Sequence, residues 1–292
     1  MVFFEKKIGE GSFCRTRPTS GPYISGDTFR CLGERVVERG IWFRNRTFIP
    51  GLVFAEADEV DSLDFFNKCR QWTARNPTKR HQLVIHNGDR QPKDSSLVRL
   101  TSIFAEVFST NVLWPVRGVT AIPVGLENAH HRKNGVVSRF DRASKLNQQK
   151  PPTRTRDIGV SFNARTNEKV RSPLVPMFRD AGHEFQAPVL HPRDYIHWVR
   201  SSKFIVSPPG NGHDCHRTWE AIYLGTIPVT LEGHLHPDLV TGCPILSVPS
   251  FEEFAKLSPM DLDRKFREIA AKDSKMAYAN YWVQRMTAGS RL

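Results

Sequence analysis

Short apolar runs alternate along this 292-residue chain with stretches in which apolar residues recur at helical spacing. The runs are four to six residues long or shorter and often rich in β-branched residues, which predicts buried strands at 52–57, 82–85, 119–124, 157–162, 204–206, 227–231 and 244–248. Helical spacing predicts helices at 60–69, 96–109, from about 168, at 191–200 and from 258 onward. Nearer the start, we expect a short strand at 23–30 and a helical stretch after it to about residue 38.

The densest pattern of glycine and polar residues lies between two of these strands, at 203–231. A Pro- and Gly-rich loop follows the first strand, Asp214 is placed to cap a helix that starts at about Cys215, and Gly225 ends that helix. This predicts a β-loop-α-β unit, in which backbone N–H groups and the positive end of a helix lie beside an anion.

Two charged residues near the start of this helix point to a nucleotide ligand. Arg217 and Glu220 are three residues apart and therefore share one helical face. An arginine binds a diphosphate well, and a carboxylate one turn later accepts the hydroxyls of a ribose. A Gly-rich loop before a helix is also a common structural turn. Binding is favoured here by the polar residues that crowd the loop and helix start, which are Asn211, His213, His216, Arg217 and Glu220.

The run SPPGNGHDCHRTWEAIYLGTIPV at 207–229 resembles the C-terminal signature of the exostosin-type glycosyltransferases, especially their short soluble members. Three further segments occur in the order that this family shows: VIHNGD at 84–89, IPVGLEN at 122–128 and SFNARTNEKVR at 161–171. The first eighty residues match only loosely. The resemblance implies an α/β, GT-B-like fold, with two Rossmann-like domains facing across a cleft, and sugar transfer from a nucleotide sugar with inversion.

A chain of this length holds two domains of ordinary size. We expect an N-terminal, acceptor-binding Rossmann-like domain at 1–130, a basic linker at 131–156, a C-terminal, nucleotide-sugar-binding Rossmann-like domain at 157–260, and a helix at 261–292 that returns toward the first domain. From His130 to Arg156, eight Lys or Arg residues face a single acidic residue, Asp141, and Pro151-Pro152 breaks regular structure. We interpret this segment as a solvated connection, with attraction to a membrane surface or an acidic glycan as the alternative.

An inverting transferase needs a base that removes the proton of the acceptor hydroxyl. Polar residues at strand ends are the candidates, because the ends of strands in a Rossmann-like sheet face the cleft. In order of preference they are Asp89, Asp27 and His86. As alternatives, Asp89 caps a turn and Asp27 caps the helix that follows it.

The remaining candidates divide between donor and acceptor. The resemblance implies that the donor is bound by Asn163, Arg165, Arg171, Gly210, Asn211, Gly212, His213, Arg217 and Glu220. Contacts to the acceptor or the donor sugar are expected from Glu127, Asn128 and Glu232, and the base pocket from 181–185 and the Pro-rich stretch after it. Asp261-Leu262-Asp263 has the form of a D-x-D metal motif, but Ser258-Pro259 before it indicates a capped helix start. No metal and no cofactor is therefore expected.

The composition limits the classes of ligand and the compartment that we expect for this protein. The net charge of +12 suits anionic ligands, among them nucleotide sugars, acidic glycans and nucleic acid. Nucleic-acid binding calls for aromatics interleaved with basic residues, whereas the segment 130–156 contains a single aromatic, Phe140. Five scattered cysteines without a C-x-x-C pair suit a reducing compartment. No apolar run approaches the roughly 20 residues of a membrane span, and the first seven residues are too charged for a signal peptide.

These observations predict a soluble cytoplasmic protein of bacterial or viral type, with at most peripheral membrane contact. Its expected activity is metal-independent, inverting transfer from a nucleotide-diphosphate sugar to a hydroxyl of a glycan or glycoconjugate. UDP is the preferred nucleotide, with GDP behind it, and UDP-xylose is one candidate donor. A nucleotide-sugar-binding protein without catalysis is the alternative, and a nucleic-acid-binding protein is a weaker one.

Overall fold

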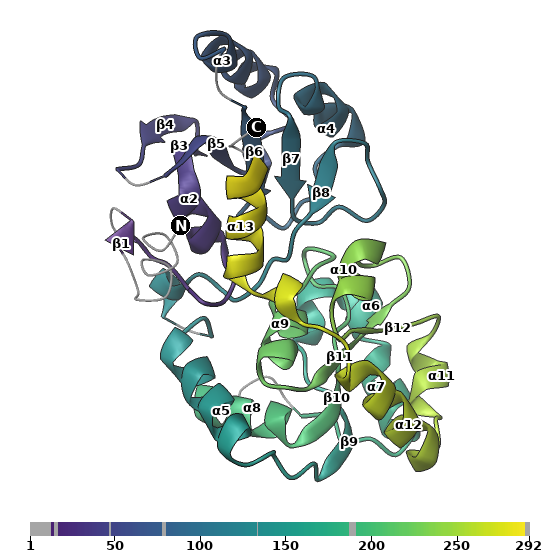
Figure 1. Ribbon diagram of the computed structural model, residues 1–292. Coiled ribbons are helices and arrows are strands. Elements are labelled where there is room, and N and C mark those ends of the chain that lie inside the picture. Colours follow the sequence, from purple (N-terminus) through teal and green to yellow (C-terminus); the bar gives the residue numbers. More distant parts are fainter. Residues whose placement is uncertain are drawn as a thin grey trace.

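The computed structural model describes residues 13–14, 17–46, 48–77, 80–132, 134–186 and 191–289. Two parallel sheets organise them, one in each half of the chain (Figure 1). The N-terminal sheet has six strands in the order β4 (Ile41–Arg44), β3 (Gly33–Glu38), β5 (Ile49–Glu56), β6 (Gln82–His86), β7 (Glu106–Ser109) and β8 (Val119–Ala121). All neighbours in it are parallel except β3 and β4, which form an antiparallel pair.

Three helices belong to this sheet along the chain: α2 (Gly26–Leu32), α3 (Leu63–Ala74) and α4 (Asp94–Thr101). Strands β5 and β6 are continuous apolar runs with their interior fully buried, as expected of parallel strands covered on both faces. Short elements complete this half: β1 (Phe13–Cys14) pairs with β2 (Arg17–Pro18), and single turns form at η1 (Ala57–Glu59) and η2 (Ala129–His131).

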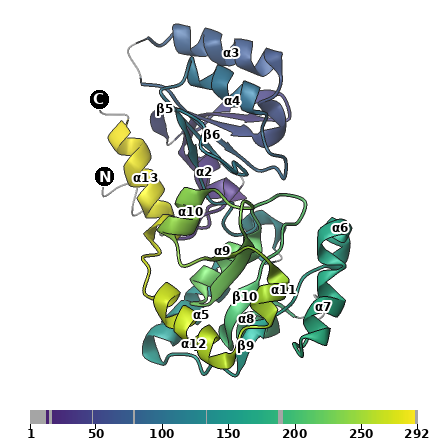
Figure 2. The same cartoon turned by 90° about the vertical axis from the view of Figure 1, so that its right-hand side faces the viewer.

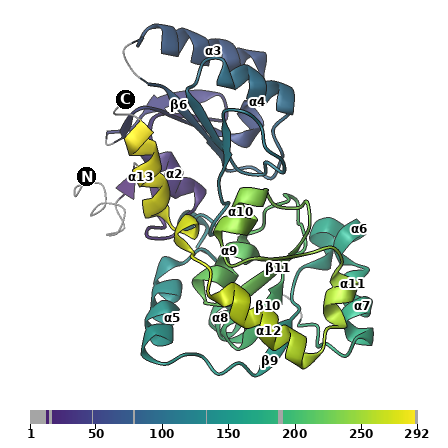
Figure 3. The same ribbon diagram turned by 45° about the vertical axis from the view of Figure 1, so that its right-hand side comes forward.

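The C-terminal sheet has four parallel strands in the order β12 (Leu246–Val248), β11 (Ile227–Leu231), β10 (Ser202–Val206) and β9 (Arg156–Gly159). Around it along the chain lie η3 (Ala164–Asn167) and the helices α5 (Val137–Gln149), α6 (Glu168–Arg171), α7 (Leu174–Asp180), α8 (Pro192–Arg200), α9 (His216–Tyr223), α10 (Pro237–Gly242), α11 (Phe251–Ala255) and α12 (Pro259–Ala270). Figures 1 and 3 show α5 on one side of this half and α6, α7 and α11 on the other.

The chain then returns to the N-terminal half through η4 (Lys275–Ala277) and α13 (Ala279–Gly289), drawn in yellow beside the upper sheet in Figure 2. The Ala279 N–H donates to the Pro22 carbonyl (3.0 Å), the Trp282 ring meets the Phe108 ring edge-on, and Arg285 pairs with Glu106 at 2.8 Å. Trp282 is completely buried, so α13 supplies part of the core beneath the N-terminal sheet.

The predicted α/β, GT-B-like class is confirmed, with two Rossmann-like units of parallel strands and helices. Two local predictions were wrong. The helix expected at 96–109 ends at Thr101, and 106–109 form β7, in which Val107 and Phe108 are buried. The strand and helix expected at 23–38 are reversed, because 26–32 form α2 and 33–38 form β3. Both errors lie in short apolar stretches, where periodicity does not separate a strand from a helix.

Candidate functional site

Hydrogen bonds from Arg171 fix the conformation of the loop between β10 and α9, residues 207–215. Its Nε donates to the carbonyl of Pro209 and its Nη2 to that of Pro208, both at 3.0 Å, and its Nη1 donates to the Asn163 carbonyl at 3.2 Å. Burial lowers the pKa of Arg171. A Cβ on Gly210 would lie 2.9 Å from Arg171 Nη2, so this close packing requires glycine. Two of the three guanidinium nitrogens thus brace the loop, and the third links it to Asn163.

The first turn of α9 is docked on the N-terminal half. Asp214 does not cap the helix as the sequence predicted, because Cys215 is the N-cap and makes no side-chain cap. The Asp214 carboxylate instead accepts from the Val124 N–H (2.8 Å) and from Trp219 Nε1 (2.7 Å). Burial raises the pKa of Asp214 to about 7, although these two bonds favour the carboxylate. His216 Nδ1 lies 2.8 Å from the Gly125 carbonyl, a second link between the halves.

Arg217 and Glu220 meet at a tyrosine that the sequence did not single out as a site residue. Glu220 is buried, and the Tyr195 hydroxyl donates to its Oε2 at 2.7 Å. Burial, followed by the negative charge of Glu220, raises the pKa of Tyr195, whereas the neighbouring Arg217 acts in the opposite direction. Arg217 Nε is buried and has no hydrogen-bond partner among the residues that the structure describes. The predicted shared face of the two charged residues therefore exists, with Tyr195 fixing one oxygen of the carboxylate.

Two histidines lie near the carboxyl ends of β10 and β11. The rings of His213, in the loop, and His234, beyond β11, stack with centroids 5.8 Å apart. Burial lowers the pKa of both, and Nδ1 of each ring is buried without a hydrogen-bond partner. Together with Arg217 Nε, they give the C-terminal half three buried nitrogen atoms that none of the described residues satisfies. Such atoms are costly unless a ligand or water meets them.

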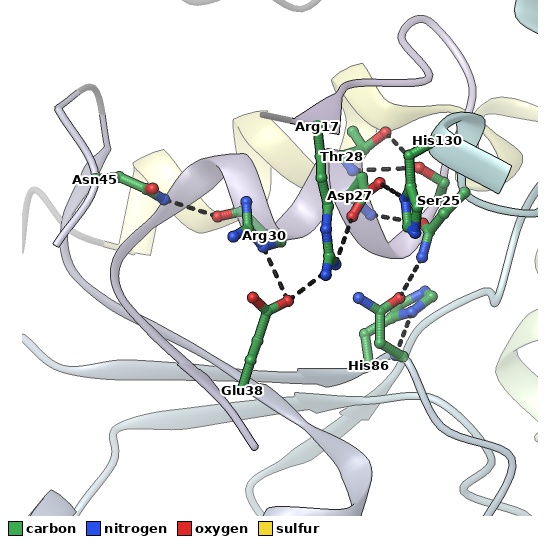
Figure 4. Close-up of polar contacts among 11 residues, drawn as sticks. Arg17, Ser25, Asp27, Thr28, Arg30, Glu38, Asn45, His86 and His130 are labelled. Atoms are coloured by element: carbon green, nitrogen blue, oxygen red, sulfur yellow. Dashed lines mark hydrogen bonds and ion pairs between the residues drawn. The ribbon is translucent and has the colours of Figure 1, made fainter. Parts of the chain in front are cut away.

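The N-terminal half carries a second polar cluster, around the start of α2 (Figure 4). The side chain of Asp27 is fully buried; its Oδ2 lies 2.7 Å from His130 Nδ1 and its Oδ1 lies 3.4 Å from Arg17. Asn128 Oδ1 accepts from the Asp27 N–H (2.8 Å), and Asn128 Nδ2 donates to Asn87 Oδ1 (2.9 Å). We call Asp27, His86, Asn87, Asn128 and His130 the Asp27 network.

His86 supports this network from β6. Its Nδ1 accepts from the N–H of Asn87 at 2.8 Å, so its Nε2 carries the hydrogen and donates to the Pro123 carbonyl at 3.2 Å. Burial lowers the pKa of His86 to about 4, which keeps the ring neutral near pH 7. With both ring nitrogens engaged, His86 is placed as a support and does not offer a free nitrogen to a substrate.

Asp89 lies where the two halves touch. Its side chain is exposed, and a Cβ on Gly212 would lie 3.0 Å from the Asp89 carbonyl and 3.1 Å from Asn111 Oδ1. Asn111 also accepts from the Asp214 N–H (3.0 Å) and donates to the Gly88 carbonyl (3.2 Å). The structure thus brings together the VIHNGD segment, the IPVGLEN segment and the loop at 207–215.

The other predicted residues lie around these clusters. Arg165 and Asn163 are exposed at η3, where Asn163 Oδ1 accepts from the Arg165 N–H. Glu127 accepts from the Asn134 N–H (2.9 Å), and Glu232 is exposed directly after β11. Asn211 is exposed in the loop, whereas Gly212 is buried. For the expected base pocket, Phe185 pairs with Val160 in a parallel bridge, and 187–190 lie outside the described residues.

Sequence reasoning missed His130 and Tyr195 as site residues. His130 was considered only as the first residue of the basic segment 130–156, although it follows Asn128 by only two residues in a polar run after a strand. That run was the available signal, since polar residues at the end of a strand also point to His86 and Asp89. Tyr195 lies on the helix predicted at 191–200, and its partner Glu220 lies 25 positions away along the chain.

No protein-family model matches this chain, and neither does any curated protein, so the exostosin resemblance rests on the quoted residues alone. Among solved structures, the chain is similar to the catalytic domain of starch synthase IV from Arabidopsis thaliana bound to ADP and acarbose. The identity is 9%, the TM-score is 0.40, and the match covers 83% of this chain and 73% of that one. At that distance, the activity has to be argued from the residues. None of the described helices has the length and apolarity to cross a bilayer.

Proposed function

We propose that this protein is a glycosyltransferase that moves a sugar from a nucleotide-diphosphate donor to a hydroxyl of a glycan or glycoconjugate, with inversion. One observation carries the proposal: the start of α9, with Arg217 and Glu220 on one face, is docked on Val124 and Gly125 of the N-terminal half. A donor bound there lies beside the segment that leads into the Asp27 network. Transfer requires donor and acceptor to meet in this way.

The donor's diphosphate is assigned to the N-terminus of α9 and to Arg217, whose Nε has no protein partner. Arg171 acts here by holding the loop that presents these groups, and Arg165 adds positive charge from η3. Fixed positive charge stabilises a leaving diphosphate as a divalent cation does in other enzymes, so we propose that no divalent metal is needed. The neighbouring His213 and His234 supply further nitrogen atoms to the phosphates or the sugar.

The nucleoside is assigned to Glu220, because a carboxylate held by one oxygen can accept ribose hydroxyls through the other. We assign the contact with the donor sugar to Glu232, which is exposed after β11, and the contact with the acceptor to Glu127. We propose UDP as the nucleotide, with UDP-xylose among the candidate donors. Inversion follows if the acceptor oxygen attacks from the N-terminal half while the diphosphate leaves on the C-terminal half.

A thermal-shift screen against UDP, GDP, CMP and UDP-sugars in EDTA tests this proposal. A ligand at 100 times its Kd stabilises the protein by about 2.7 kcal/mol, which is a measurable shift. Losing a hydrogen bond to a charged group costs about 1.5–3 kcal/mol, so Arg217→Ala is expected to raise the Kd roughly 10- to 150-fold. Arg264→Ala is the matched control, since Arg264 is exposed on α12 and pairs with Asp261.

The second readout is release of nucleoside diphosphate from UDP-sugars in the presence of simple glycosides. Nucleotide binding in EDTA that is lost in Arg217→Ala, together with this release, is the expected result. Binding without any release would favour the non-catalytic nucleotide-sugar-binding protein. If no nucleotide shifts the wild-type protein, the assignment of the α9 site is wrong.

A further inference from the structure

The proposed transfer requires a base on the N-terminal half, and the Asp27 network holds one imidazole in a form suited to that task. The His130 side chain is 29% exposed, whereas the Asp27 side chain beneath it is 0% exposed. We propose that His130 is the general base of the transfer and that Asp27 positions its ring. This inference deepens the proposed function and rests on it.

The contact between the two residues decides which ring nitrogen is free. His130 Nδ1 lies 2.7 Å from Asp27 Oδ2, and an ionised carboxylate only accepts hydrogen bonds. The hydrogen of neutral His130 is therefore on Nδ1, which leaves the lone pair on Nε2. A buried carboxylate behind a partly exposed imidazole sets the tautomer of the ring and stabilises the cation that forms when Nε2 takes a proton.

The Asp27 network also fixes the backbone near both Asp27 and His130. Asn128, two residues before His130, uses its Oδ1 for the Asp27 N–H and its Nδ2 for Asn87. Asn87 itself has a φ of +57°, a left-handed conformation that suits a tight turn after β6. The His131 ring packs on the His130 ring with centroids 4.0 Å apart. These contacts hold the imidazole in one orientation, which a base in transfer chemistry requires.

The charged groups around His130 come from three elements. Asp27 faces it from α2, His131 from the same turn, and Arg17 of β2 contacts the other Asp27 oxygen at 3.4 Å (Figure 4). Arg17 also pairs with Glu38 at 3.1 Å, and Glu38 pairs with Arg30 at 2.9 Å. Arg17 thus lies between two carboxylates, and Asp27 retains one oxygen for His130.

The other candidate bases are placed less well. Both ring nitrogens of His86 are engaged, and the Asp27 carboxylate has no exposed surface from which to meet a hydroxyl. Asp89 is exposed, where a hydrated carboxylate is a weaker base than an imidazole near neutral pH. His130 also continues the segment 122–128, on which the donor-binding helix α9 docks through Val124 and Gly125.

The chemical step balances with these groups. The proton of the acceptor hydroxyl moves to His130 Nε2 as the acceptor oxygen forms a bond to the anomeric carbon. The bond from that carbon to the diphosphate oxygen breaks, and its electron pair leaves with the nucleoside diphosphate on the side of Arg217. The imidazolium, paired with Asp27, then gives its proton to solvent.

His130→Gln tests the inference, with His197→Gln as the matched control at an exposed histidine of α8. Loss of a general base lowers the rate roughly 10²- to 10⁴-fold. We therefore expect this fall in diphosphate release for His130→Gln, an unchanged thermal shift with UDP, and near wild-type release for His197→Gln. In wild type, protonation of an imidazole gives the pH–rate profile an acidic limb. That limb should be absent from the residual activity of His130→Gln, and added imidazole should restore part of the rate.

Nitrogen NMR of the histidine rings provides a readout that needs no substrate. The inference requires a hydrogen on Nδ1 of neutral His130, and Asp27→Asn should change this tautomer while UDP binding is retained. A hydrogen on Nε2 in the wild-type protein would overturn the inference.

The kinetic outcomes separate the two proposals. If the wild type releases diphosphate and His130→Gln does so equally fast, His130 is not the base, and the proposed transferase activity stands. If the wild type binds UDP but releases nothing, or binds no nucleotide, the proposed function fails and the inference fails with it.

Discussion

The two polar clusters of this protein differ in how many of their polar atoms have hydrogen-bond partners within the protein. In the Asp27 network, both nitrogens of His86, both amide atoms of Asn128 and both oxygens of Asp27 contact protein groups. Around α9, by contrast, Arg217 Nε and the Nδ1 atoms of His213 and His234 are buried without a partner. Asp214 and His216 bond to Val124 and Gly125, which lie a few residues before Asn128 and His130 in the chain. The two clusters are therefore neighbours, and their different hydrogen bonding is not explained by separate locations.

This contrast indicates a division of labour. A closed network holds a side chain in one orientation, which suits a group that transfers a proton. A cluster with unpartnered donors and acceptors gains most when a charged ligand meets them. We therefore expect changes in the Asp27 network to affect stability and turnover, and changes around α9 to affect nucleotide binding.

The largest expected effect is on the pH dependence of stability, through His86. Its folded pKa of about 4 lies below the ordinary value of 6.5, so the unfolded chain takes up the proton first. Its contribution is fully present above pH 6.5 and is lost as the pH falls toward 4, with a total loss of about 3 kcal/mol. Urea unfolding of the wild type and of His86→Asn at pH 7, 6 and 5 measures this contribution. It is the difference between the two proteins in how steeply the free energy of unfolding changes with pH.

The comparison with the variant is necessary because Asp214 titrates in the opposite sense. Its folded pKa of about 7 lies above its ordinary value of 3.8, so it favours the folded state as the pH falls through the same range. The two contributions partly cancel in the wild type. Parallel pH dependences of wild type and His86→Asn would show that His86 takes up a proton as readily in the folded protein as in the unfolded chain, and the closed network would be disproved.

A matched pair of glycines compares the packing of the clusters. A Cβ on Gly26 would lie 1.6 Å from Asn87 Oδ1 and 2.9 Å from His86 Nδ1, whereas the nearest atom to a Cβ on Gly212 is the Asp89 carbonyl oxygen at 3.0 Å. We expect Gly26→Ala to lower the free energy of unfolding by about 2 kcal/mol, and Gly212→Ala by less than about 1 kcal/mol. Denaturant unfolding measures both free energies. Equal decreases in the two variants would mean that the Asp27 network accommodates an added methyl group as easily as the loop at 207–215 does.

The smallest effect is expected from Tyr195→Phe, which removes the hydroxyl that donates to Glu220. One hydrogen bond contributes about 1 kcal/mol, so the Kd for UDP should rise roughly fivefold. Inorganic pyrophosphate, which has no ribose, should bind equally well to both proteins if Glu220 holds the nucleoside. Calorimetry with the two ligands checks this, and an equal loss for pyrophosphate would place the role of Tyr195 at the diphosphate instead.

Local patterns predicted the donor side of the site well. The expected strand, loop, helix and strand are β10, 207–215, α9 and β11, and Trp219, Ile222 and Tyr223 of α9 are buried. These features follow from periodicity and turn residues within thirty positions of one another, which is where sequence reasoning is strongest. The incorrect prediction that Asp214 caps α9 shows the limit of such reasoning. The Asp214 carboxylate instead accepts a hydrogen bond from Val124, which lies 90 positions away along the chain.

The Asp27 network was harder to predict for the same reason. Asp27 and His86 were selected because they appeared to end strands, and Asn128 because of the family resemblance. Asp27 instead lies in the first turn of α2, and its contact with His130 spans 103 positions. Sequence reasoning also did not anticipate α5 within the basic segment, where Phe140 is buried against Tyr23 and Tyr223. Such pairings depend on how distant elements pack.

Helix α13 has a consequence for the order in which the protein is made. Its Trp282, Val283 and Met286 are buried in the same core as the strands of the N-terminal sheet. A ribosome therefore releases β3 through β8 long before the helix that completes their core, and the whole C-terminal half emerges in between. The N-terminal half therefore completes its core only after the C-terminal half has been synthesised, and the nascent chain exposes apolar surface until α13 emerges.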